Sequence, residues 1–341
     1  MENPGGVSAS APEVTVLIAT RNRARFLPDA IATALAQEDV EVEVVVVDDA
    51  SDDETPELLA AVADARVRVV RLPEQLGMGE ARNAGIAAAR GQWVAFLDDD
   101  DLWAPHKLRR QLDAARDADA TWVYCGVVLV SADGAVVPMW GPPDPRTVLR
   151  ELLRRNVVQA ASSCLLIDAA RLRAVGGIED GLSTPRDLLI RLAQDGPAAV
   201  VEEPLVAYRR HSATFISQSR ERAIAEAKHV ERKHWGLALE HGVRFDLDHF
   251  ERWLRSERIR SGRQAAEARL REGRRAEAAR LQLLTLARSR SWRDLRRLLR
   301  IAAGERARTA FRRAVPADDA PSADSVPAWL SAQLHASAAN G

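Results

Sequence analysis

The sequence predicts an α/β fold with a mostly parallel central sheet flanked by helices, followed by a C-terminal helical extension. Three observations support this fold class: apolar, β-branched runs recur through the N-terminal part, segments of helical periodicity separate them, and polar clusters follow the runs. Strands that are buried on both faces and alternate with helices pair in parallel through right-handed crossovers. Such sheets bind ligands at the carboxyl ends of their strands.

Residues 14–19 and 42–47 are nearly continuous β-branched runs and predict the first two strands. Apolar residues between these runs recur at helical spacing and predict a helix. The same patterns then predict, in order, helix 55–65, strand 66–72, helix 80–89, strand 92–97, a hairpin of 122–130 and 135–138 around Asp133 and Gly134, helices 146–155, 169–175 and 188–194, and strand 198–206.

The composition favours a cytoplasmic globular protein. The 48 basic residues nearly cancel the 49 acidic ones, so we expect no nucleic-acid partner. Cys125 and Cys164 have neither metal-site nor disulfide spacing. The sequence lacks a secretory leader pattern and an uninterrupted apolar stretch long enough for a membrane span.

Changes in composition predict four segments. We expect a flexible N-terminus (1–12), a sheet domain (13–220, with halves 13–120 and 121–220), a helical Arg-rich extension (221–314) and a mostly disordered tail (315–341). Residues 263–313 hold 16 Arg against five acids. Two interpretations stay open for this excess: a solvated helical hairpin, or a surface for anionic lipid or another partner that gives a peripheral membrane contact.

Four consecutive aspartates, Asp98 to Asp101, directly follow the strand predicted at 92–97. Aspartate at the end of a strand often caps the next helix or forms a turn. Four together repel one another unless donors or a cation offset their charge, and clustered carboxylate oxygens suit a hard divalent cation. Thr20 and Arg21 follow the first strand and Asp48 and Asp49 the second, so all these clusters are expected at one edge of the sheet.

Several of these stretches, in this order, resemble motifs of the family 2 glycosyltransferases with a GT-A nucleotide-sugar fold. They are residues 16–23, 46–53, 81–85 and 96–108, together with Gly176-Gly177 and 208–211. The resemblance covers about residues 14 to 219. It implies that the half 13–120 binds a nucleoside diphosphate sugar, that the half 121–220 receives the acceptor, and that a sugar moves to an acceptor hydroxyl with inversion.

The resemblance also implies roles for the aspartates. Asp98 and Asp100 match the outer positions of the family's Asp-x-Asp motif, in which the last Asp ligates the metal and the first contacts the ribose or a metal-bound water. All-oxygen ligation suits Mn²⁺ or Mg²⁺. A diphosphate leaving group gains charge as the glycosidic bond breaks, and a divalent cation stabilises that charge. Asp99 and Asp101 are then candidates for structural roles.

Other donor-side residues are implied in the same way. Asp49 resembles the acid that accepts a hydrogen bond from N3–H of uracil or thymine, which predicts a UDP- or dTDP-linked donor. Thr20 and Arg21 match the loop that passes the base and the diphosphate. Arg82 follows a Gly-x-Gly segment and is a candidate for phosphate binding or nucleotide anchoring, and an ordinary surface ion pair is the alternative for it.

The acceptor hydroxyl needs a general base, and here the sequence departs from the family. In one alignment, Asp187 matches the acid that follows the family's acidic pair. Thr184 and Pro185 then replace that pair, and the base is absent. If the loop is two residues shorter, Asp187 is itself the base, which we favour over a helix-capping role. His211 matches a late motif in which a histidine approaches the diphosphate or the metal.

The sequence leaves the acceptor open among a glycan, a lipid-linked glycan and a small-molecule hydroxyl. Two other functions stay open as well. A nucleotidyltransferase acting on sugar phosphates also uses a parallel sheet and carboxylate-held Mg²⁺, although it should carry a Gly-rich basic loop after the first strand. A non-catalytic nucleotide-sugar-binding protein is the other, suggested by the altered site at Thr184 and Pro185.

Overall fold

The computed structural model describes residues 11–130, 136–138, 141–158, 162–179, 185–209, 220–245, 247–303 and 327–330. The chain forms two compact units. The first comprises Met1–Val128, Met139–Tyr208 and Pro327–Gly341, and the second Leu129–Pro138 and Arg209–Val326.

The first unit begins with four parallel strands and three helices, as predicted. The strands are β1 (Val14–Thr20), β2 (Val42–Asp48), β3 (Val67–Arg71) and β4 (Trp93–Phe96), and the helices are α1 (Leu27–Leu35), α2 (Thr55–Ala60) and α3 (Met78–Ala88). The strand order is β3-β2-β1-β4, with parallel pairing throughout. The order reverses at β1, so the chain crosses the sheet between β3 and β4.

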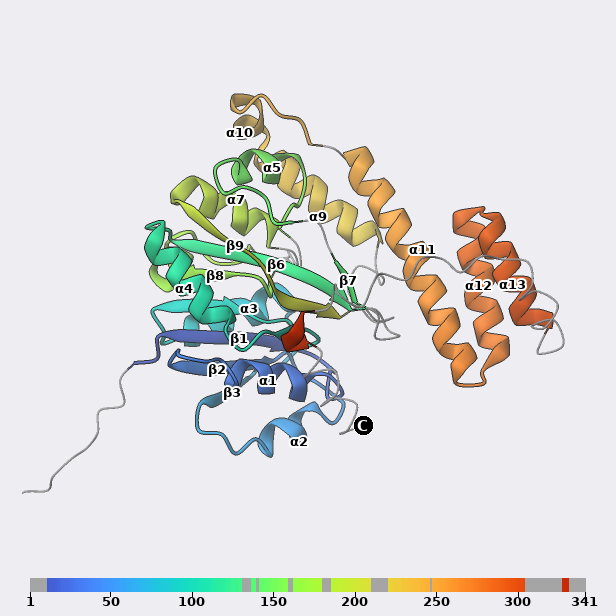
Figure 1. The fold of residues 1–341 in the computed structure, drawn as a ribbon, viewed down its shortest axis with the longest axis horizontal. Coiled ribbons are helices and arrows are strands. Elements are labelled where there is room, and N and C mark those ends of the chain that lie inside the picture. Colours follow the sequence, from blue (N-terminus) through green and yellow to red (C-terminus); the bar gives the residue numbers. More distant parts are fainter. Residues whose placement is uncertain are drawn as a thin grey trace, which may run out of the picture. The chain divides into compact units, whose positions relative to one another are not determined.

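Antiparallel strands extend this sheet, so the sheet as a whole is mixed (Figure 1). Its order continues from β4 through β8, β6 and β9 to β5. The predicted α/β class is therefore confirmed, and parallel pairing holds for the N-terminal half. The elements are β5 (Leu102–Trp103), α4 (Lys107–Asp117), β6 (Trp122–Val130), β7 (Val136–Pro138), α5 (Val148–Arg154), β8 (Leu166–Asp168), α6 (Ala169–Ala174), α7 (Arg186–Asp195) and β9 (Ala198–Arg209).

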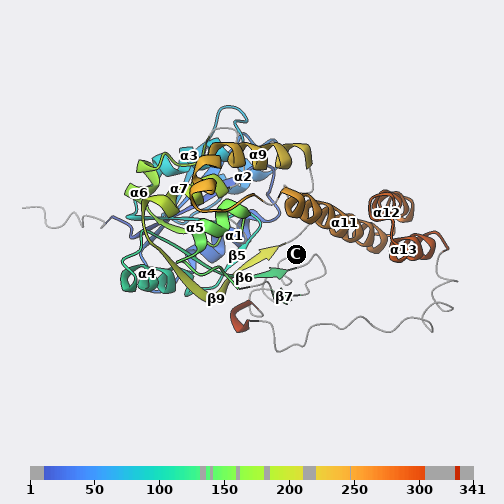
Figure 2. The same ribbon diagram turned by 90° about the horizontal axis from the view of Figure 1, so that it is seen from above.

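The parallel strands form the core because every residue of β1 and β2 is buried. Helices α3 and α4 lie on opposite sides of the strands (Figure 2). Gly85 lets α3 approach β1 closely, since a Cβ atom at this position would lie 2.5 Å from Cδ1 of Leu17. The close contact fixes the height of α3 over the sheet, and α3 carries the candidate residue Arg82.

The described residues of the second unit after β9 are mainly helical. The helices are α9 (Arg220–Lys233), α10 (Trp235–Glu240), α11 (Leu247–Arg271), α12 (Arg275–Ser289) and α13 (Trp292–Ala303). A small core of Ala266, Ala278 and Ile301 joins α11, α12 and α13. Among the described helices, we find none whose length and hydropathy would suit a membrane span.

A short segment of the predicted disordered tail is ordered. Residues 327–330 include a helical turn, in which Leu330 is fully buried. The indole Nε1–H of Trp329 donates a hydrogen bond to the carbonyl of Pro204 in β9 (3.1 Å). Burial of apolar side chains offsets the entropy of ordering, and composition does not reveal such a contact. The rest of the tail and the tip of the predicted hairpin at Asp133 and Gly134 lie outside the described residues.

Candidate active site

The polar clusters meet at one edge of the sheet, as predicted. Thr20, the last residue of β1, pairs with Asp48, the last residue of β2. On the other side of β1, Leu17 pairs with Phe96 at the end of β4. The loops that follow β1, β2 and β4 therefore leave the sheet beside one another.

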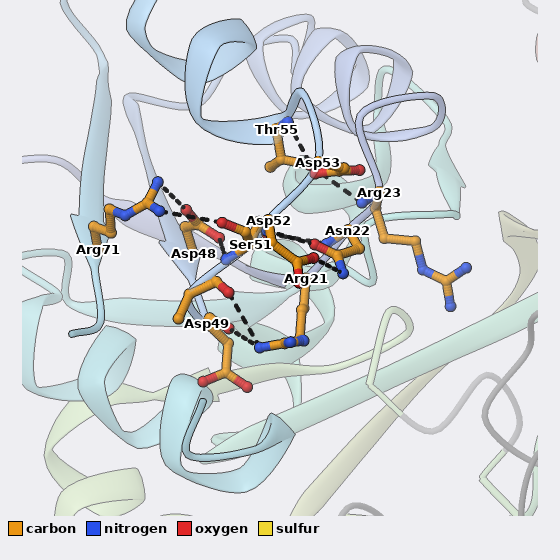
Figure 3. A network of polar contacts seen from close by, with 11 residues as sticks. Arg21, Asn22, Arg23, Asp48, Asp49, Ser51, Asp52, Asp53, Thr55 and Arg71 are labelled. Carbon is orange, nitrogen blue, oxygen red and sulfur yellow. Dashed lines mark hydrogen bonds and ion pairs between the residues drawn. The ribbon is translucent and has the colours of Figure 1, made fainter. Parts of the chain in front are cut away.

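Hydrogen bonds join the loop after β1 to the loop after β2 (Figure 3). The side chain of Asn22 donates to Oδ1 of Asp52 (2.5 Å) and accepts from the amide of Asp52 (2.9 Å). Asn22 has a φ of 55°, and asparagine tolerates this left-handed conformation better than most residues. Nη1 of Arg21 donates to the carbonyls of Asp49 (3.0 Å) and Ala50 (3.1 Å). Arg21 therefore braces the second loop.

Asp48 has a structural role in the turn after β2. Its carboxylate is buried and accepts from the amide of Ser51 (2.9 Å) and from Nη1 of Arg71 (3.1 Å). The other arm of Arg71 donates to the carbonyl of Ser51 (3.1 Å). Through these contacts, Asp48 stabilises the turn that follows β2.

Asp49 binds the start of helix α3. Its two carboxylate oxygens accept from the amides of Leu76 (2.7 Å) and Gly77 (2.9 Å). Gly77 has a φ of 101°, which favours glycine, and it directly precedes the helix. A carboxylate has about four acceptor sites, so these two bonds leave capacity for the N–H of a base. The sequence did not reveal this link between Asp49 and the glycine segment.

Arg82, one turn further along α3, pairs with Asp98. Nη2 of Arg82 lies 2.8 Å from Oδ1 of Asp98, and the Arg82 side chain is almost fully buried. The hydroxyl of Ser163 donates to Oδ2 of Asp101 (2.5 Å), and the Ser163 hydroxyl oxygen accepts from the amide of Asp98 (3.0 Å). Asp101 is fully buried. It holds the aspartate loop in place, in line with the structural role that the sequence left open for it.

Thr20 connects Asp49 with the aspartate cluster. Its carbonyl accepts from the amide of Asp49 (2.9 Å), and its hydroxyl donates to Oδ2 of Asp99 (2.7 Å). Nε of Arg23 lies 3.8 Å from Oδ1 of Asp99. Thr20, Asp49, Arg82 and Asp98 therefore belong to one continuous region, joined through the start of α3 and the end of β1.

The aspartates of this cluster influence one another's pKa values. Burial, and next the charge of Asp100, raise the pKa of Asp99 to about 8. The pKa of Asp98 is also raised, by burial and against the pull of Arg82. Solvent weakens this effect, because 29% of the Asp98 side chain is exposed. Asp100 is buried.

Asp98 and Asp100 could supply carboxylate oxygens to a divalent cation. Crowded carboxylates with raised pKa values favour an added positive charge. Within the described residues, no group of three or more His, Cys, Asp or Glu side chains is placed to hold a metal by itself. Mg²⁺ is commonly held by one or two carboxylates plus substrate phosphates and water, and Asp98 and Asp100 match that donor set.

A buried lysine supports the aspartate loop from behind. Nε1 of Trp103 donates to the carbonyl of Ser163 (2.8 Å), and Nζ of Lys107 lies 3.8 Å from the centre of the Trp103 ring. Lys107 is fully buried and donates to Oε1 of Gln111 (2.7 Å), and burial lowers the pKa of Lys107 to about 8. The sequence had not singled out Ser163 or Lys107. A lysine six residues after Asp101 is the sequence signal that could have pointed to Lys107.

The predicted base Asp187 is buried and paired with Arg191. Nε of Arg191 lies 2.8 Å from Oδ2 of Asp187, four residues earlier on α7, and Asp187 is 1% exposed. The other guanidinium nitrogens of Arg191 donate to the carbonyl of Val175 and to that of Gly177 (2.7 Å). Through these contacts, Arg191 anchors the Gly176-Gly177 turn. A role as base requires Asp187 to act beside Arg191.

Asn83 ties the same turn to helix α3. Its side chain donates to the carbonyl of Ile178 (2.8 Å) and accepts from the amide of Ile178 (2.9 Å). Gly177 has a φ of 64°, and a Cβ atom there would lie 2.7 Å from Oδ1 of Asn83. Asn83 directly follows Arg82, so α3 contacts both the aspartate loop and the Gly176-Gly177 turn. His211 and Thr184 lie outside the described residues.

A search of protein families gives a match over the region that contains these loops. Residues 15–169 match the model described as glycosyl transferase family 2. The chain is similar to the succinoglycan biosynthesis protein ExoO of Rhizobium meliloti, with 44% identity over 160 residues, which is 46% of each protein. It is also similar to the UDP-Glc:alpha-D-GlcNAc-diphosphoundecaprenol beta-1,3-glucosyltransferase WfaP of Escherichia coli, with 30% identity over 99 residues, which is 29% of this chain and 39% of WfaP.

The chain thus spans less than half the length of either relative. Among solved structures, it resembles residues 1–349 of S. aureus TarS, crystallised with UDP-GlcNAc, with a TM-score of 0.55. This match covers 74% of this chain and 72% of that one at 16% identity, and it supports the fold alone. Residues 15–169 therefore match glycosyl transferase family 2, and the domain that contains them has a GT-A-like fold.

Proposed function

We propose that this protein is an inverting glycosyltransferase that moves a sugar from a UDP- or dTDP-linked donor to an acceptor hydroxyl, assisted by Mn²⁺ or Mg²⁺. One observation carries the donor side of the proposal. The two residues that precede helix α3 bind Asp49, and Arg82 of α3 binds Asp98, so candidate contacts for the base and for the diphosphate are held by one helix and its start.

Each donor-side residue then has a chemical task. Asp49 accepts a hydrogen bond from the base edge, and only a base with an N–H there, such as uracil or thymine, satisfies it. Arg82 is positioned beside Asp98, where its guanidinium can also bind phosphate oxygens. Asp98 and Asp100 hold the cation, which when bound stabilises the charge that develops on the diphosphate. His211 assists at the same group.

On the acceptor side, Asp187 is the candidate base. Two features favour it: Asp187 lies in the first turn of α7, and the turn that Arg191 anchors is tied to α3 through Asn83. A general base must lie within hydrogen-bond reach of the proton that it abstracts. Arg191 would keep Asp187 ionised, because an adjacent cation stabilises the charged form of a carboxylate.

The names of the relatives support a glycan or a lipid-linked glycan as acceptor, in preference to a small-molecule hydroxyl. One relative is named for succinoglycan biosynthesis and another for transfer to a diphosphoundecaprenol-linked sugar. We also propose a cytoplasmic location, because Cys125 and Cys164 are free thiols, which suit a reducing compartment. The family match does not support the nucleotidyltransferase alternative.

Substitution of Asp100 tests the proposal. We expect wild-type protein to release UDP or dTDP from a matching donor in the presence of Mn²⁺, and Asp100→Ala to lose roughly 10² to 10³ of this rate, as when one electrostatic contact to developing charge is removed. Asp117→Ala, at an exposed position at the end of α4, is the matched control. Equal rates for Asp100→Ala and wild type would refute the metal-assisted mechanism.

A second candidate function is favoured by the ion pair of Asp187 with Arg191. If this pair is purely structural and Thr184 and Pro185 replace the acidic pair, the protein binds a nucleotide sugar without transferring it. Calorimetry separates the two candidates: cation-dependent binding of UDP with no turnover across glycan and lipid-linked acceptors supports the binding protein. Turnover of any of these acceptors excludes it.

A further inference from the structure

Helix α12 exposes a stripe of leucine flanked by arginine. Leu283 and Leu284 are 55% and 46% exposed. Arg280 lies one turn before them and Arg288 one turn after, and both are exposed. The opposite side of the helix is buried, through Ala278, Gln282 and Thr285. Residues three and four apart share a helix face, so the two leucines and the two arginines form one outward-facing stripe.

Helix α13 exposes a second stripe of the same kind. Trp292 is 75% exposed and Leu299 is 53% exposed. Arg296, which is also exposed, lies four residues after Trp292 and three before Leu299. The spacing places all three on one face of the helix. The inward face carries Asp294 and Ile301, which are buried.

The acids of these two helices are neutralised from outside them. Asp294 accepts two hydrogen bonds from Arg263 of α11, both of 2.7 Å, and Glu277 pairs with Arg274 (2.6 Å). Residues 275–303 contain no other acid. The same residues contain eight arginines: Arg275, Arg280, Arg288, Arg290, Arg293, Arg296, Arg297 and Arg300.

The positive charge of the stripes therefore faces solvent. In the part of the chain that the structure describes, Arg280, Arg288 and Arg296 form no ion pair with another side chain. Long arginine side chains can lay their aliphatic stems along apolar surface and keep the charged group at a polar boundary. Exposed leucine and tryptophan beside such arginines suit a surface whose outer layer is negatively charged and whose interior is apolar.

We propose that α12 and α13 dock onto the surface of an anionic lipid bilayer. Trp292, Leu299, Leu283 and Leu284 enter the boundary between headgroups and acyl chains, and the arginines bind lipid phosphates. Helices with Trp and Leu beside Arg lie in the plane of such interfaces, and anionic headgroups attract basic segments near the surface. Helix α13, with 12 residues, is about 18 Å long and so suits a position along the surface.

Vesicle flotation with the full chain tests this surface. The probes are vesicles of phosphatidylcholine alone and vesicles that also contain phosphatidylglycerol. We expect roughly tenfold tighter binding to the anionic vesicles, and weaker binding at high salt because salt screens surface charge. Trp292→Ser with Leu299→Ser should weaken binding roughly tenfold. Arg280→Gln with Arg288→Gln and Arg296→Gln should remove the preference for anionic vesicles.

Matched substitutions on α10 provide the control. Trp235 and Leu239 are 48% and 55% exposed, so Trp235→Ser with Leu239→Ser removes a similar apolar area and should leave vesicle binding unchanged. Asp100→Ala, which tests the proposed transfer, should also bind vesicles as wild type does, so the two proposals can fail separately.

Two results would overturn the docking surface. One is vesicle binding that does not depend on the stripes. In that case wild type binds neutral and anionic vesicles equally, or the α13-altered and arginine-altered variants both bind as tightly as wild type does. The other is a change in oligomeric state on Trp292→Ser with Leu299→Ser, measured by sedimentation velocity, without a change in vesicle binding. That result would identify a second copy of the chain as the occupant of these stripes.

Discussion

Two regions of the first unit differ in how their candidate residues are held. We call the proposed donor-binding region around Thr20, Asp49, Arg82 and Asp98 the donor edge, and the region around Asp187 that we propose receives the acceptor the acceptor edge. At the donor edge, Thr20, Asp49, Arg82 and Asp98 are linked through direct hydrogen bonds and the start of α3. At the acceptor edge, the corresponding candidate, Asp187, is buried in a pair with a residue of its own helix. The donor-edge contacts join different strands and loops, whereas Asp187 contacts a neighbour four residues away.

The difference shows where spacing in a sequence constrains geometry. A parallel strand that ends at a given residue places the next side chain at the sheet edge, and three such ends meet through the pairing of β1 with β2 and β4. The segment before α7 does not follow a predicted strand, so no strand end fixes the position of Asp187 in the sequence. Two alignments of Asp187 therefore remained open, whereas the positions of Asp49 and Asp98 followed from their strands.

Substitution of Asp187 tests the acceptor edge and should have the largest effect on stability. Asp187→Ala leaves Arg191 without its carboxylate, and loss of one partner of a buried ion pair costs about 3 kcal/mol. Because 18% of the Arg191 side chain is exposed, we expect a cost no larger than this value. Chemical denaturation of wild type and variant measures the difference.

A change at the other end of α7 gives the control. Asp195→Ala removes a pair in which Nη1 of Arg171 and Oδ2 of Asp195 are 3.5 Å apart and more exposed, so it should cost less than about 1 kcal/mol. Activity distinguishes the two roles of Asp187. If Asp187→Asn retains wild-type stability and yet loses about 10² to 10⁴ in rate, Asp187 is a base and the two edges are more alike than their contacts suggest.

Substitution of Arg82 tests the donor edge. Arg82→Gln removes the charged donor beside Asp98, and hydrogen bonds to charged groups are worth about 1.5 to 3 kcal/mol. We expect donor affinity, measured by calorimetry with UDP, to fall by about 10 to 100 times. Arg116→Gln, at a position on α4 that is 67% exposed, should bind UDP as wild type does. Unchanged affinity of Arg82→Gln would leave Arg82 with only its structural ion pair to Asp98.

Much of the donor edge could be predicted from the sequence, because strand ends and helix starts have local signals. The runs 14–19, 42–47 and 92–97 placed the candidates at one edge, and β1, β2 and β4 end within one or two residues of them. The partners of these candidates had no such signal. Ser163 reaches the amide of Asp98 across 65 residues of sequence, and the carboxylate of Asp49 meets amides 27 and 28 residues away. Pairings of this range depend on tertiary packing.

The link between the two edges is tested at Asn83. Asn83→Ala removes both hydrogen bonds to Ile178 and leaves the partly buried amide and carbonyl of Ile178 without these partners. We expect the free energy of unfolding to fall by about 1 to 3 kcal/mol. Gly177→Ala should also destabilise, because of its positive φ and the short distance to Asn83. The double variant should cost less than the sum of the two, since Asn83→Ala removes the clashing atom. Strict additivity in denaturation experiments would show that the turn is not held through Asn83.

Arg71 should have the smallest effect, and it distinguishes what organises the turn after β2. The Arg71 side chain is 51% exposed, and its pair with Asp48 spans 3.1 Å. Exposed ion pairs contribute about 0 to 1 kcal/mol. The buried Asp48 carboxylate also accepts from the amide of Ser51, and the amide of Asp49 binds the carbonyl of Thr20. The turn therefore depends on contacts that Arg71→Gln leaves intact, and UDP affinity should stay close to that of wild type. A loss of affinity as large as that of Arg82→Gln would mean that the donor edge depends on its exposed charges rather than on its strand ends.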